Sequence, residues 1–517
     1  MAEEIVLDGE SLTPETLFKL SQGKCKLSIT EQAQLRVNKS REVVDRIVES
    51  GKVVYGINTG FGYFANVRIP PGDLSKLQAN LIRSHCVGVG TPLSPERTRM
   101  LLALRINVLS KGFSGIGPEL LNKMLEAYNK DCLPFIPEQG TVGASGDLAP
   151  LAHLSLGLMG EGLMWDQESS SYLASNEVAA KKGFQYVSEL KPKEGLAMIN
   201  GTQMICALLT EAYVRCFRLA LTADVLAALS SEVLRGTARA YMSSAHQARP
   251  HPGQITVAKR LRQLISTENI SSQISDSHKD CGKVQDAYSL RCVPQVHGAV
   301  WDAIEYVRKG LTIELNSATD NPMIFPDNPP EDQVVSAGNF HGEYPAKLCD
   351  TLAIYVHELS SISETRIQRL MDSNKSELPH FLTEEPGLNS GLMMAHCTAA
   401  ALVSENKSLV HPASTDTITT SAGQEDHVSM GGWAARKLLK VVENVENVLA
   451  IELLSLNQGI EFLRPLRTSE PLERVIQVVR QKVPYMPQDS VLYDKISKLR
   501  EMIVNEEIIS EVKDYLN

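Results

Sequence analysis

The sequence predicts a mainly α-helical protein, a bundle of long helices with a smaller mixed region near the N-terminus. Aromatic residues make up 5% of the 517 residues, so leucine, alanine, isoleucine and valine must fill the core. These residues favour helix-on-helix packing over a β-sandwich. Apolar side chains also recur at the helical spacing of about 3.6 residues over long segments. These segments are residues 203–235, 295–315, 345–371, 392–407 and 431–459.

The first 50 residues are predicted to form a small mixed segment that leads into a helix. Thr30 and Glu31 are typical of the start of this helix. Its apolar stripe is formed by Val37, Val43, Val44 and Ile47.

Residues 51–72 are predicted to form a long loop, because glycine and proline interrupt any periodic pattern there. Loops of this length are usually functional or disordered. This loop carries too many apolar and aromatic side chains to be well solvated, among them Tyr55, Phe61, Tyr63 and Phe64. It is therefore expected to cover an active site or to form an interface.

Further helical segments are predicted over residues 74–82, 99–109 and 151–158, with a glycine- and proline-rich break before the last of them. The chain is accordingly divided into an N-terminal region, residues 1–200, and a core of long helices with C-terminal helices, residues 201–517. Polar, glycine-rich loops lie between the long helices. Functional residues are usually found in such loops.

Composition excludes several classes of function. The net charge is -10 and no lysine or arginine cluster is present, so neither nucleic acid nor a membrane is an expected partner. The nine cysteines are scattered without any C-x-x-C pair, which argues against a disulfide framework and against a zinc ribbon. The acidic start at Met1 is not followed by an apolar stretch, so no secretory signal is expected. We expect a cytoplasmic protein with reduced thiols and no metal.

The strongest motif is the stretch GTVGASGDLAPLAH over residues 140–153. Considered alone, it is a tight turn that leads into a helix, with Asp147 placed to cap that helix. A hydrolase nucleophile elbow, G-x-S-x-G, requires glycine two positions after the serine. Here Gly146 follows Ser145 directly and Asp147 stands in the required position, so the hydrolase pattern fails.

The same stretch closely resembles the ammonia-lyase and aminomutase family that carries a methylidene-imidazolone (MIO) prosthetic group. In that family an Ala-Ser-Gly tripeptide cyclises, and its small side chains permit the compression that this requires. The resemblance implies that Ala144, Ser145 and Gly146 form MIO without an external cofactor. It also implies a fumarase/aspartase-like bundle of long helices, with MIO and a catalytic tyrosine loop in the N-terminal region.

Further motifs follow in the family's order from about Val53 to beyond Met430. They are YGINTGFG at 55–62, MINGT at 198–202, QDAYSLR at 285–291, GNFHG at 338–342 and QED at 424–426. The resemblance implies catalytic roles for Tyr55 and Tyr288. It implies substrate-binding roles for Asn200, Gln285, Arg291, Asn339 and Phe340, with Arg291 on the substrate carboxylate.

Each of these motifs alone has a plainer interpretation. Tyr55 alone is more often a buried tyrosine, and Asn200 followed by glycine is a common turn. Gln285, Tyr288 and Arg291 stand at i, i+3 and i+6, so a partly irregular segment is needed to bring them together. The joint occurrence of the motifs, in order, favours the family.

Two short signatures predict the substrate. Ser84-His85 resembles the pair found in the family's histidine-specific lyases, although some tyrosine aminomutases share it. Phenylalanine-specific members tend to carry Phe-Leu there, and tyrosine-specific lyases carry His-Leu. Glu425 stands where tyrosine-acting members often have glutamine, and a carboxylate suits an imidazole N–H. The expected reaction is the non-oxidative elimination of ammonia from L-histidine to trans-urocanate, the first step of histidine degradation.

Three alternatives stay open at this point. Two are a tyrosine or phenylalanine ammonia-lyase and a 2,3-aminomutase. The third, from another class, is a catalytically silent helical scaffold. Family membership further implies a homotetramer whose active sites are shared between subunits.

Overall fold

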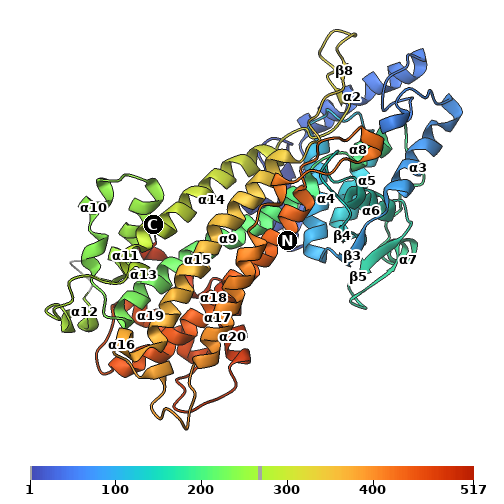
Figure 1. Ribbon diagram of the computed structural model, residues 1–517. Helices are drawn as coiled ribbons and strands as arrows, with labels where there is room; N and C mark the ends of the chain where they lie inside the picture. Colours follow the sequence, from blue (N-terminus) through green and yellow to red (C-terminus); the bar gives the residue numbers. More distant parts are fainter. Residues whose placement is uncertain (1–2, 266–270, 517) are drawn as a thin grey trace. The chain divides into compact units, whose positions relative to one another are not determined.

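The computed structural model describes residues 3–265 and 271–516, which fold into long helices with a few short strands (Figure 1). The chain divides into two compact units. Unit 1 comprises Met1–Glu211, Arg308–Asp350 and Pro412–Arg436. Unit 2 comprises Ala212–Val307, Thr351–His411 and Lys437–Asn517. The division at residue 200 inferred from the sequence stays a prediction.

The strands of unit 1 form two-stranded sheets. β1 (Glu3–Leu7) lies parallel to β2 (Cys25–Ile29), with Ile5 opposite Leu27. The other pairs are antiparallel: β3 (Val89–Pro92) with β4 (Pro137–Gln139), β5 (Leu163–Asp166) with β6 (Ser171–Ala174), and β7 (Met323–Ile324) with β8 (Val334–Val335). The N-terminal part of the chain is therefore mixed, as predicted.

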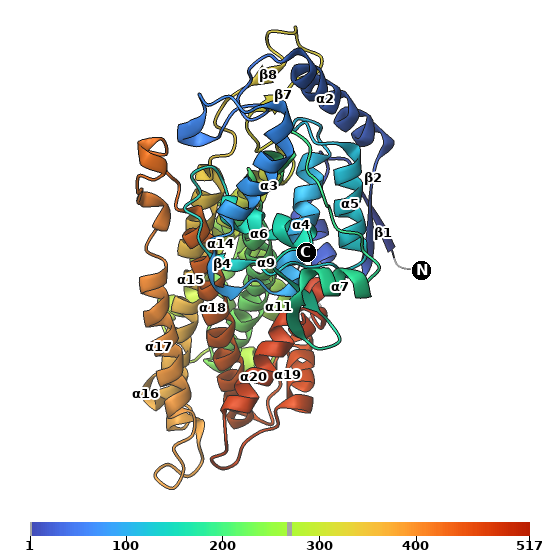
Figure 2. The ribbon, with the colours of Figure 1, turned by 90° about the vertical axis from the view of Figure 1, so that its right-hand side faces the viewer.

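Most helices of unit 1 are shorter than the long helices of the bundle, although α2 has 20 residues. They are α1 (Pro14–Ser21), α2 (Glu31–Ser50), α3 (Leu74–His85), α4 (Pro95–Leu109), α5 (Pro118–Asn129), α6 (Leu148–Leu158), α7 (Ser175–Lys181) and α8 (Glu194–Ile199). Figure 2 shows β1 and β2 beside α5.

Helix α2 begins where the sequence predicts. The Thr30 hydroxyl accepts a hydrogen bond from the Ala33 N–H at 3.1 Å and so caps the helix. The predicted apolar stripe faces inward, and its Val43 and Val44 are buried against Ile57 and Ile324. This contact attaches the loop after α2 to the core.

The predicted loop at residues 51–72 contains two short 3-10 helices, η1 (Gly62–Phe64) and η2 (Pro71–Asp73). Its base is fixed by Asn58, whose side chain accepts from the Val54 N–H at 2.8 Å and donates to the Lys52 carbonyl at 2.8 Å. Its tip carries Tyr63 and Phe64, which are largely exposed.

The predicted capping role of Asp147 is wrong. Asp147 occupies the N-cap position of α6, but its side chain makes no capping hydrogen bond there. Its carboxylate instead accepts from the Ile205 N–H at 2.9 Å, in the first turn of the next long helix. The positive end of that helix attracts the carboxylate, which places the turn at residues 143–147 on top of it.

The long helices confirm the predicted bundle. They are α9 (Gln203–Val233), α14 (Val293–Leu315), α15 (Glu343–Met371), α17 (Met393–Leu409) and α18 (Gly431–Gly459). The remaining α-helices are α10 (Ser243–Gln247), α11 (Pro252–Ile265), α12 (Gln273–Ser277), α13 (Tyr288–Arg291), α16 (Ser373–Ser376), α19 (Glu470–Lys482), α20 (Tyr493–Val504) and α21 (Glu507–Ser510).

Within unit 2, the long helices are joined by buried polar contacts as well as by apolar packing. Glu452 on α18 accepts from the Arg366 guanidinium on α15 at 2.5 Å and from the Ser230 hydroxyl on α9 at 2.8 Å. All three side chains are buried. Because a buried charge needs a partner, this cluster restricts how the three helices can be aligned.

Candidate active site

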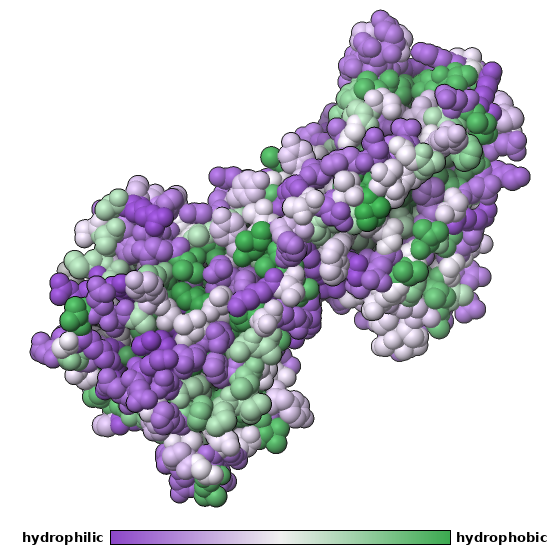
Figure 3. All heavy atoms as spheres, in the orientation of Figure 1, coloured by the Kyte–Doolittle hydropathy of each residue, from purple (hydrophilic) through white to green (hydrophobic). Residues whose placement is uncertain are grey.

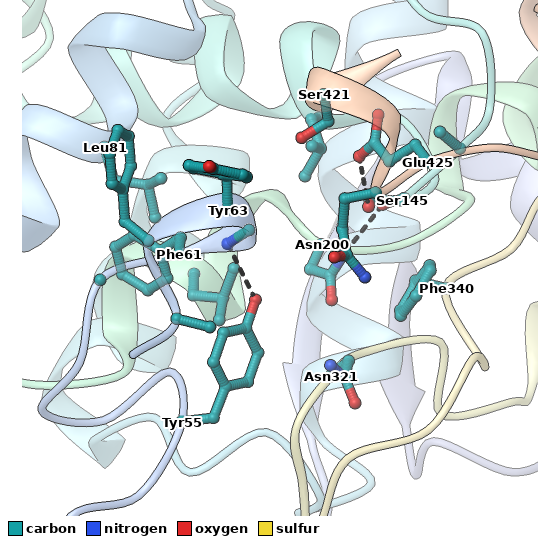
Figure 4. Close-up of a pocket in the computed structure, with 18 of the residues that line it drawn as sticks. Tyr55, Phe61, Tyr63, Leu81, Ser145, Asn200, Asn321, Phe340, Ser421 and Glu425 are labelled. Atoms are coloured by element: carbon teal, nitrogen blue, oxygen red, sulfur yellow. Dashed lines mark hydrogen bonds between the residues drawn. The ribbon is translucent and has the colours of Figure 1, made fainter. Parts of the chain in front are cut away.

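A cavity of about 1100 Å³ lies within unit 1. It is lined by the loop at residues 51–72, α3, the turn before α6, the end of α8, and loops near residues 340 and 425. Figure 4 shows Tyr55, Phe61 and Tyr63 on one side and Ser145, Asn200 and Glu425 on the other.

The turn that contains Ala144-Ser145-Gly146 is pressed against a second backbone segment. Gly146 has a φ of +71° and forms a β-bridge with Gly201. A Cβ atom added to Gly146 would lie 2.1 Å from the Gly201 carbonyl oxygen, so glycine is required there. The Asp147 N–H donates to the same carbonyl at 2.6 Å.

Two carbonyl oxygens of the turn, those of Ser145 and Gly146, accept hydrogen bonds from side chains. The Asn200 side-chain amide donates to the Ser145 carbonyl at 2.8 Å. The Thr141 hydroxyl donates to the Gly146 carbonyl at 3.1 Å and itself accepts from the Gly143 N–H at 3.1 Å. The turn is therefore held in one conformation.

The Ser145 side chain is also held. Its hydroxyl donates to Oε1 of Glu425 at 3.0 Å (Figure 4). The Thr420 hydroxyl donates to Oε2 of the same carboxylate at 2.6 Å. Glu425 is half-buried and lines the cavity. Thr420 itself was not singled out by sequence reasoning.

Asp147 lies directly behind the turn and is fully buried. Burial raises the pKa of its carboxyl to about 7, although hydrogen bonds from the amides at the start of α9 act in the opposite direction. A group with such a pKa exchanges protons close to neutral pH, beside the residues that are expected to cyclise.

His85 presents one ring nitrogen for binding. Its Nδ1 lies 2.8 Å from the Leu81 carbonyl oxygen, which can only accept, so Nδ1 carries a proton. In the neutral ring, Nε2 is therefore a free acceptor. Because His85 lines the cavity, this nitrogen can receive a donor from a bound ligand.

The segment after His85 is held by His153, whose Nε2 accepts from the Gly88 N–H at 3.1 Å. Burial lowers the pKa of His153 below its ordinary value of 6.5. As the pH falls through about 6.5, His153 binds a proton in the unfolded chain before it does so in the folded protein. Proton binding therefore favours the unfolded chain, and the stability contributed by neutral His153 is lost at acid pH.

We expect His153→Gln to reduce this acid sensitivity, because glutamine keeps an acceptor for Gly88 but does not titrate. Between about pH 7 and about pH 5.5, the thermal unfolding midpoint should fall by a few degrees less in the variant than in the wild type. Differential scanning fluorimetry at both pH values measures this difference. Equal falls in the two proteins would contradict the role of His153.

Tyr55 lies across the cavity from the Ser145 turn (Figure 4). Its hydroxyl oxygen accepts from the Gly62 N–H at 3.3 Å. This hydrogen bond directs the phenol oxygen toward residues of the same loop. The loop at residues 51–72 thus supplies both the tyrosine and its donor.

Buried charges lie beneath the Asn200 segment. Lys193, at the start of α8, forms a 3.0 Å ion pair with Asp320, and both side chains are fully buried. The Arg105 guanidinium donates to the Ala197 carbonyl and to the Gln203 side chain. Together they fix α8 on one side of Asn200 and α9 on the other.

The structure brings most of the predicted site residues together. Those that line the cavity are Tyr55, His85, Ala144, Ser145, Asn200, Phe340 and Glu425, with Gly146 buried behind them. Asn339 is exposed, and its side-chain amide donates to the Ala318 carbonyl at 3.4 Å.

Three predicted residues belong to unit 2 and do not line this cavity: Gln285, Tyr288 and Arg291. As the spacing requires, the segment is only partly helical, because α13 begins at Tyr288. Tyr288 is 71% exposed, and the Arg291 guanidinium lies 4.8 Å from the centre of its ring.

Sequence reasoning missed several residues that build the site. Asn321 was not among the predicted site residues, yet it lines the cavity and its side chain accepts from the Ala337 N–H at 2.7 Å. Thr141 and Lys193 were not singled out at all. The buried position of Lys193 carries no local sequence signal, because its partner is 127 residues away.

Comparison with known proteins identifies the family. A model of the family described as aromatic amino acid lyase matches residues 12–481. The chain belongs to the aromatic amino acid lyase family. This finding confirms the family resemblance and the predicted carbon–nitrogen lyase class, and it removes the main reason to consider a silent scaffold.

Individual aromatic amino acid lyases and related structures are similar over almost the whole chain. The histidine ammonia-lyase of Bos taurus is 56% identical over 512 residues, covering 99% of this chain and 77% of the relative. The crystal structure of histidine ammonia-lyase from Trypanosoma cruzi has a TM-score of 0.92 at 51% identity, covering 99% of this chain and 96% of that one. A tyrosine aminomutase from Streptomyces globisporus has a TM-score of 0.92 at 32% identity, covering 99% of each chain. These similarities confirm the predicted fold class.

Lyases of this family depend in general on MIO. The turn fits such a group, because Gly146 leaves no room for a side chain and Asn200 already binds the Ser145 carbonyl.

Among residues 3–265 and 271–516, every helix is too short or too polar to span a bilayer.

Proposed function

We propose that the chain eliminates ammonia from L-histidine to give trans-urocanate, with an MIO group formed from Ala144, Ser145 and Gly146. The observation that carries the choice of substrate is that His85 and Glu425 line the same cavity as Ser145. An imidazole N–H requires an acceptor, which both residues provide. A plain phenyl ring has no N–H to donate, so its binding would leave the polar groups of His85 and Glu425 without hydrogen bonds. The pocket therefore discriminates against a phenyl side chain.

The remaining residues are assigned by their geometry. When formed, MIO supplies the electrophile that captures the substrate amine. Tyr55 takes the β-hydrogen, because it lies across the cavity from Ser145 and its oxygen has the Gly62 donor. Asn200 and Phe340 line the cavity and hold the amine and the ring in place. Asn339 is proposed for the same binding role on the strength of the family motif.

The substrate carboxylate requires a cation, yet among the residues that the structure describes neither a lysine nor an arginine lines the cavity. We therefore propose that Arg291, with Tyr288 and Gln285, reaches the site of another copy in a homotetramer with shared active sites. Exposed apolar side chains on the long helices support such an assembly, among them Tyr306, Tyr355 and Met394. On the face shown in Figure 3, hydrophobic patches lie among hydrophilic ones.

The proposed compartment is the cytoplasm.

The test is incubation of the purified chain with L-histidine, L-tyrosine and L-phenylalanine in separate reactions. We expect urocanate from histidine and at most traces of coumarate or cinnamate. Ser145→Ala is the control, because it cannot form the methylidene and should lose both activity and the ultraviolet absorbance of MIO. Turnover of tyrosine without turnover of histidine, or formation of β-tyrosine, would overturn the choice of substrate and reaction.

A further inference from the structure

Glu425 contacts an atom that the finished site no longer contains. Its Oε1 accepts from the Ser145 hydroxyl at 3.0 Å (Figure 4), and that hydroxyl is lost when MIO forms. A role in substrate binding alone does not account for this contact. We propose that Glu425 acts earlier, as the proton shuttle that removes the Ser145 hydroxyl during formation of MIO. This inference rests on the proposed function, since it assumes that the tripeptide cyclises.

The carboxylate is positioned for this task by Thr420. The Thr420 hydroxyl binds Oε2 at 2.6 Å, which leaves Oε1 for Ser145. Backbone hydrogen bonds between Thr420 and Glu425, of 2.9 and 3.3 Å, close the short turn that joins them. Thr420 is therefore a positioning residue that fixes which oxygen faces the serine.

On the side of Ser145 away from Glu425, the Asn200 side chain makes the Ser145 Cα–H bond easier to break. As Cα loses its proton, negative charge develops on the adjacent Ser145 carbonyl oxygen. The Asn200 amide already donates to this oxygen at 2.8 Å and is itself buried. A donor fixed in advance on a developing negative charge is among the strongest catalytic contributions that a protein site makes.

Formation of MIO requires the loss of two waters, and the atoms balance without an oxidant. In ring closure, the Gly146 nitrogen bonds to the Ala144 carbonyl carbon, and that oxygen leaves as water with protons from the Gly146 and Ser145 nitrogens. In the second step, the Cα–H and Cβ–Oγ bonds of Ser145 break, and the electron pair of the C–H bond forms the new Cα=Cβ bond. Glu425 accepts the Cα proton and passes it to Oγ, so that the hydroxyl leaves as water and the carboxylate is restored.

Glu425→Gln tests this step, because glutamine keeps the shape and hydrogen-bonding capacity of the side chain but cannot shuttle a proton. The full-length variant is purified, and its intact mass and ultraviolet spectrum are recorded. We expect a mass lower by one water instead of two and no absorbance from the conjugated methylidene. Asp426→Asn is the matched control, since Asp426 is the neighbouring acid on the same cavity and should mature fully.

The outcomes separate this inference from the proposed function. A wild-type chain that keeps both waters would contradict the proposed function itself. A matured wild type together with a fully matured Glu425→Gln chain would overturn the shuttle. Loss of neither water in a folded Glu425→Gln chain would also overturn it, because Glu425 would then act before dehydration.

Two further variants keep the test decisive if Glu425→Gln does not fold. Glu425→Asp retains a carboxylate on a shorter side chain, so it should lose the second water severalfold more slowly than the wild type. Thr420→Val, which leaves Oε2 without its donor, should also slow this loss while ring closure proceeds normally. Wild-type rates of dehydration in both variants would overturn the shuttle and the positioning role of Thr420.

Discussion

Replacing Gly146 by alanine is expected to prevent formation of the electrophile and to lower activity by more than about a thousandfold. The alanine Cβ would lie 2.1 Å from the Gly201 carbonyl oxygen, which belongs to the backbone and cannot rotate away. The φ of +71° adds roughly 1–2 kcal/mol of strain for any residue with a Cβ atom. The turn must then move away from Gly201, and the compression that drives the Gly146 nitrogen against the Ala144 carbonyl is lost.

Intact mass gives the direct readout, and the variant should keep both waters. Gly183→Ala is the matched control, because Gly183 also has a positive φ, of +61°, but its added Cβ would approach no atom closer than 3.9 Å. This control should mature normally and lose only about 1–2 kcal/mol of stability. A Gly146→Ala chain that matures fully would show that contact with Gly201 is not needed for cyclisation.

The sequence anticipated features that depend on neighbouring residues. Helix α2 begins at its Thr30 cap, and α9, α14, α15, α17 and α18 begin and end within two residues of the expected positions, because apolar periodicity is local information. The break in periodicity before residue 72 likewise located the loop that carries Tyr55. The family motifs then indicated which loops contribute to one site.

Contacts between residues distant in sequence could not be anticipated in this way. Aspartate is a residue type typical of a helix cap, yet Asp147 accepts its hydrogen bond from the N–H of Ile205, 58 residues later. Ser145 and Glu425 are 280 residues apart, and their hydrogen bond follows from how the chain folds back. Such pairs depend on tertiary packing, which neither propensity nor periodicity encodes.

The buried ion pair beneath the site has the second large expected effect. Lys193→Met should destabilise unit 1 by about 3–5 kcal/mol, because it leaves the fully buried Asp320 carboxylate without its partner. Burial lowers the pKa of Lys193 and the charge of Asp320 opposes this shift, so the pair is stable only while both members are present. Lys193 also has a φ of +73° at the start of α8, a strained conformation that this contact holds in place.

Urea denaturation followed by circular dichroism measures the loss, with Lys191→Met as the matched control. Lys191 lies two residues earlier and pairs with Glu119 at 3.1 Å, but both side chains are more than half exposed, so its loss should cost less than about 1 kcal/mol. Adding Asp320→Asn to Lys193→Met should recover much of the stability, because it removes the orphaned charge. If Lys193→Met proves no more costly than Lys191→Met, the pair does not fix α8. Because Asn200 is the C-cap of α8, loss of the pair should also slow the formation of MIO. This joint effect would distinguish support of the site from general stability.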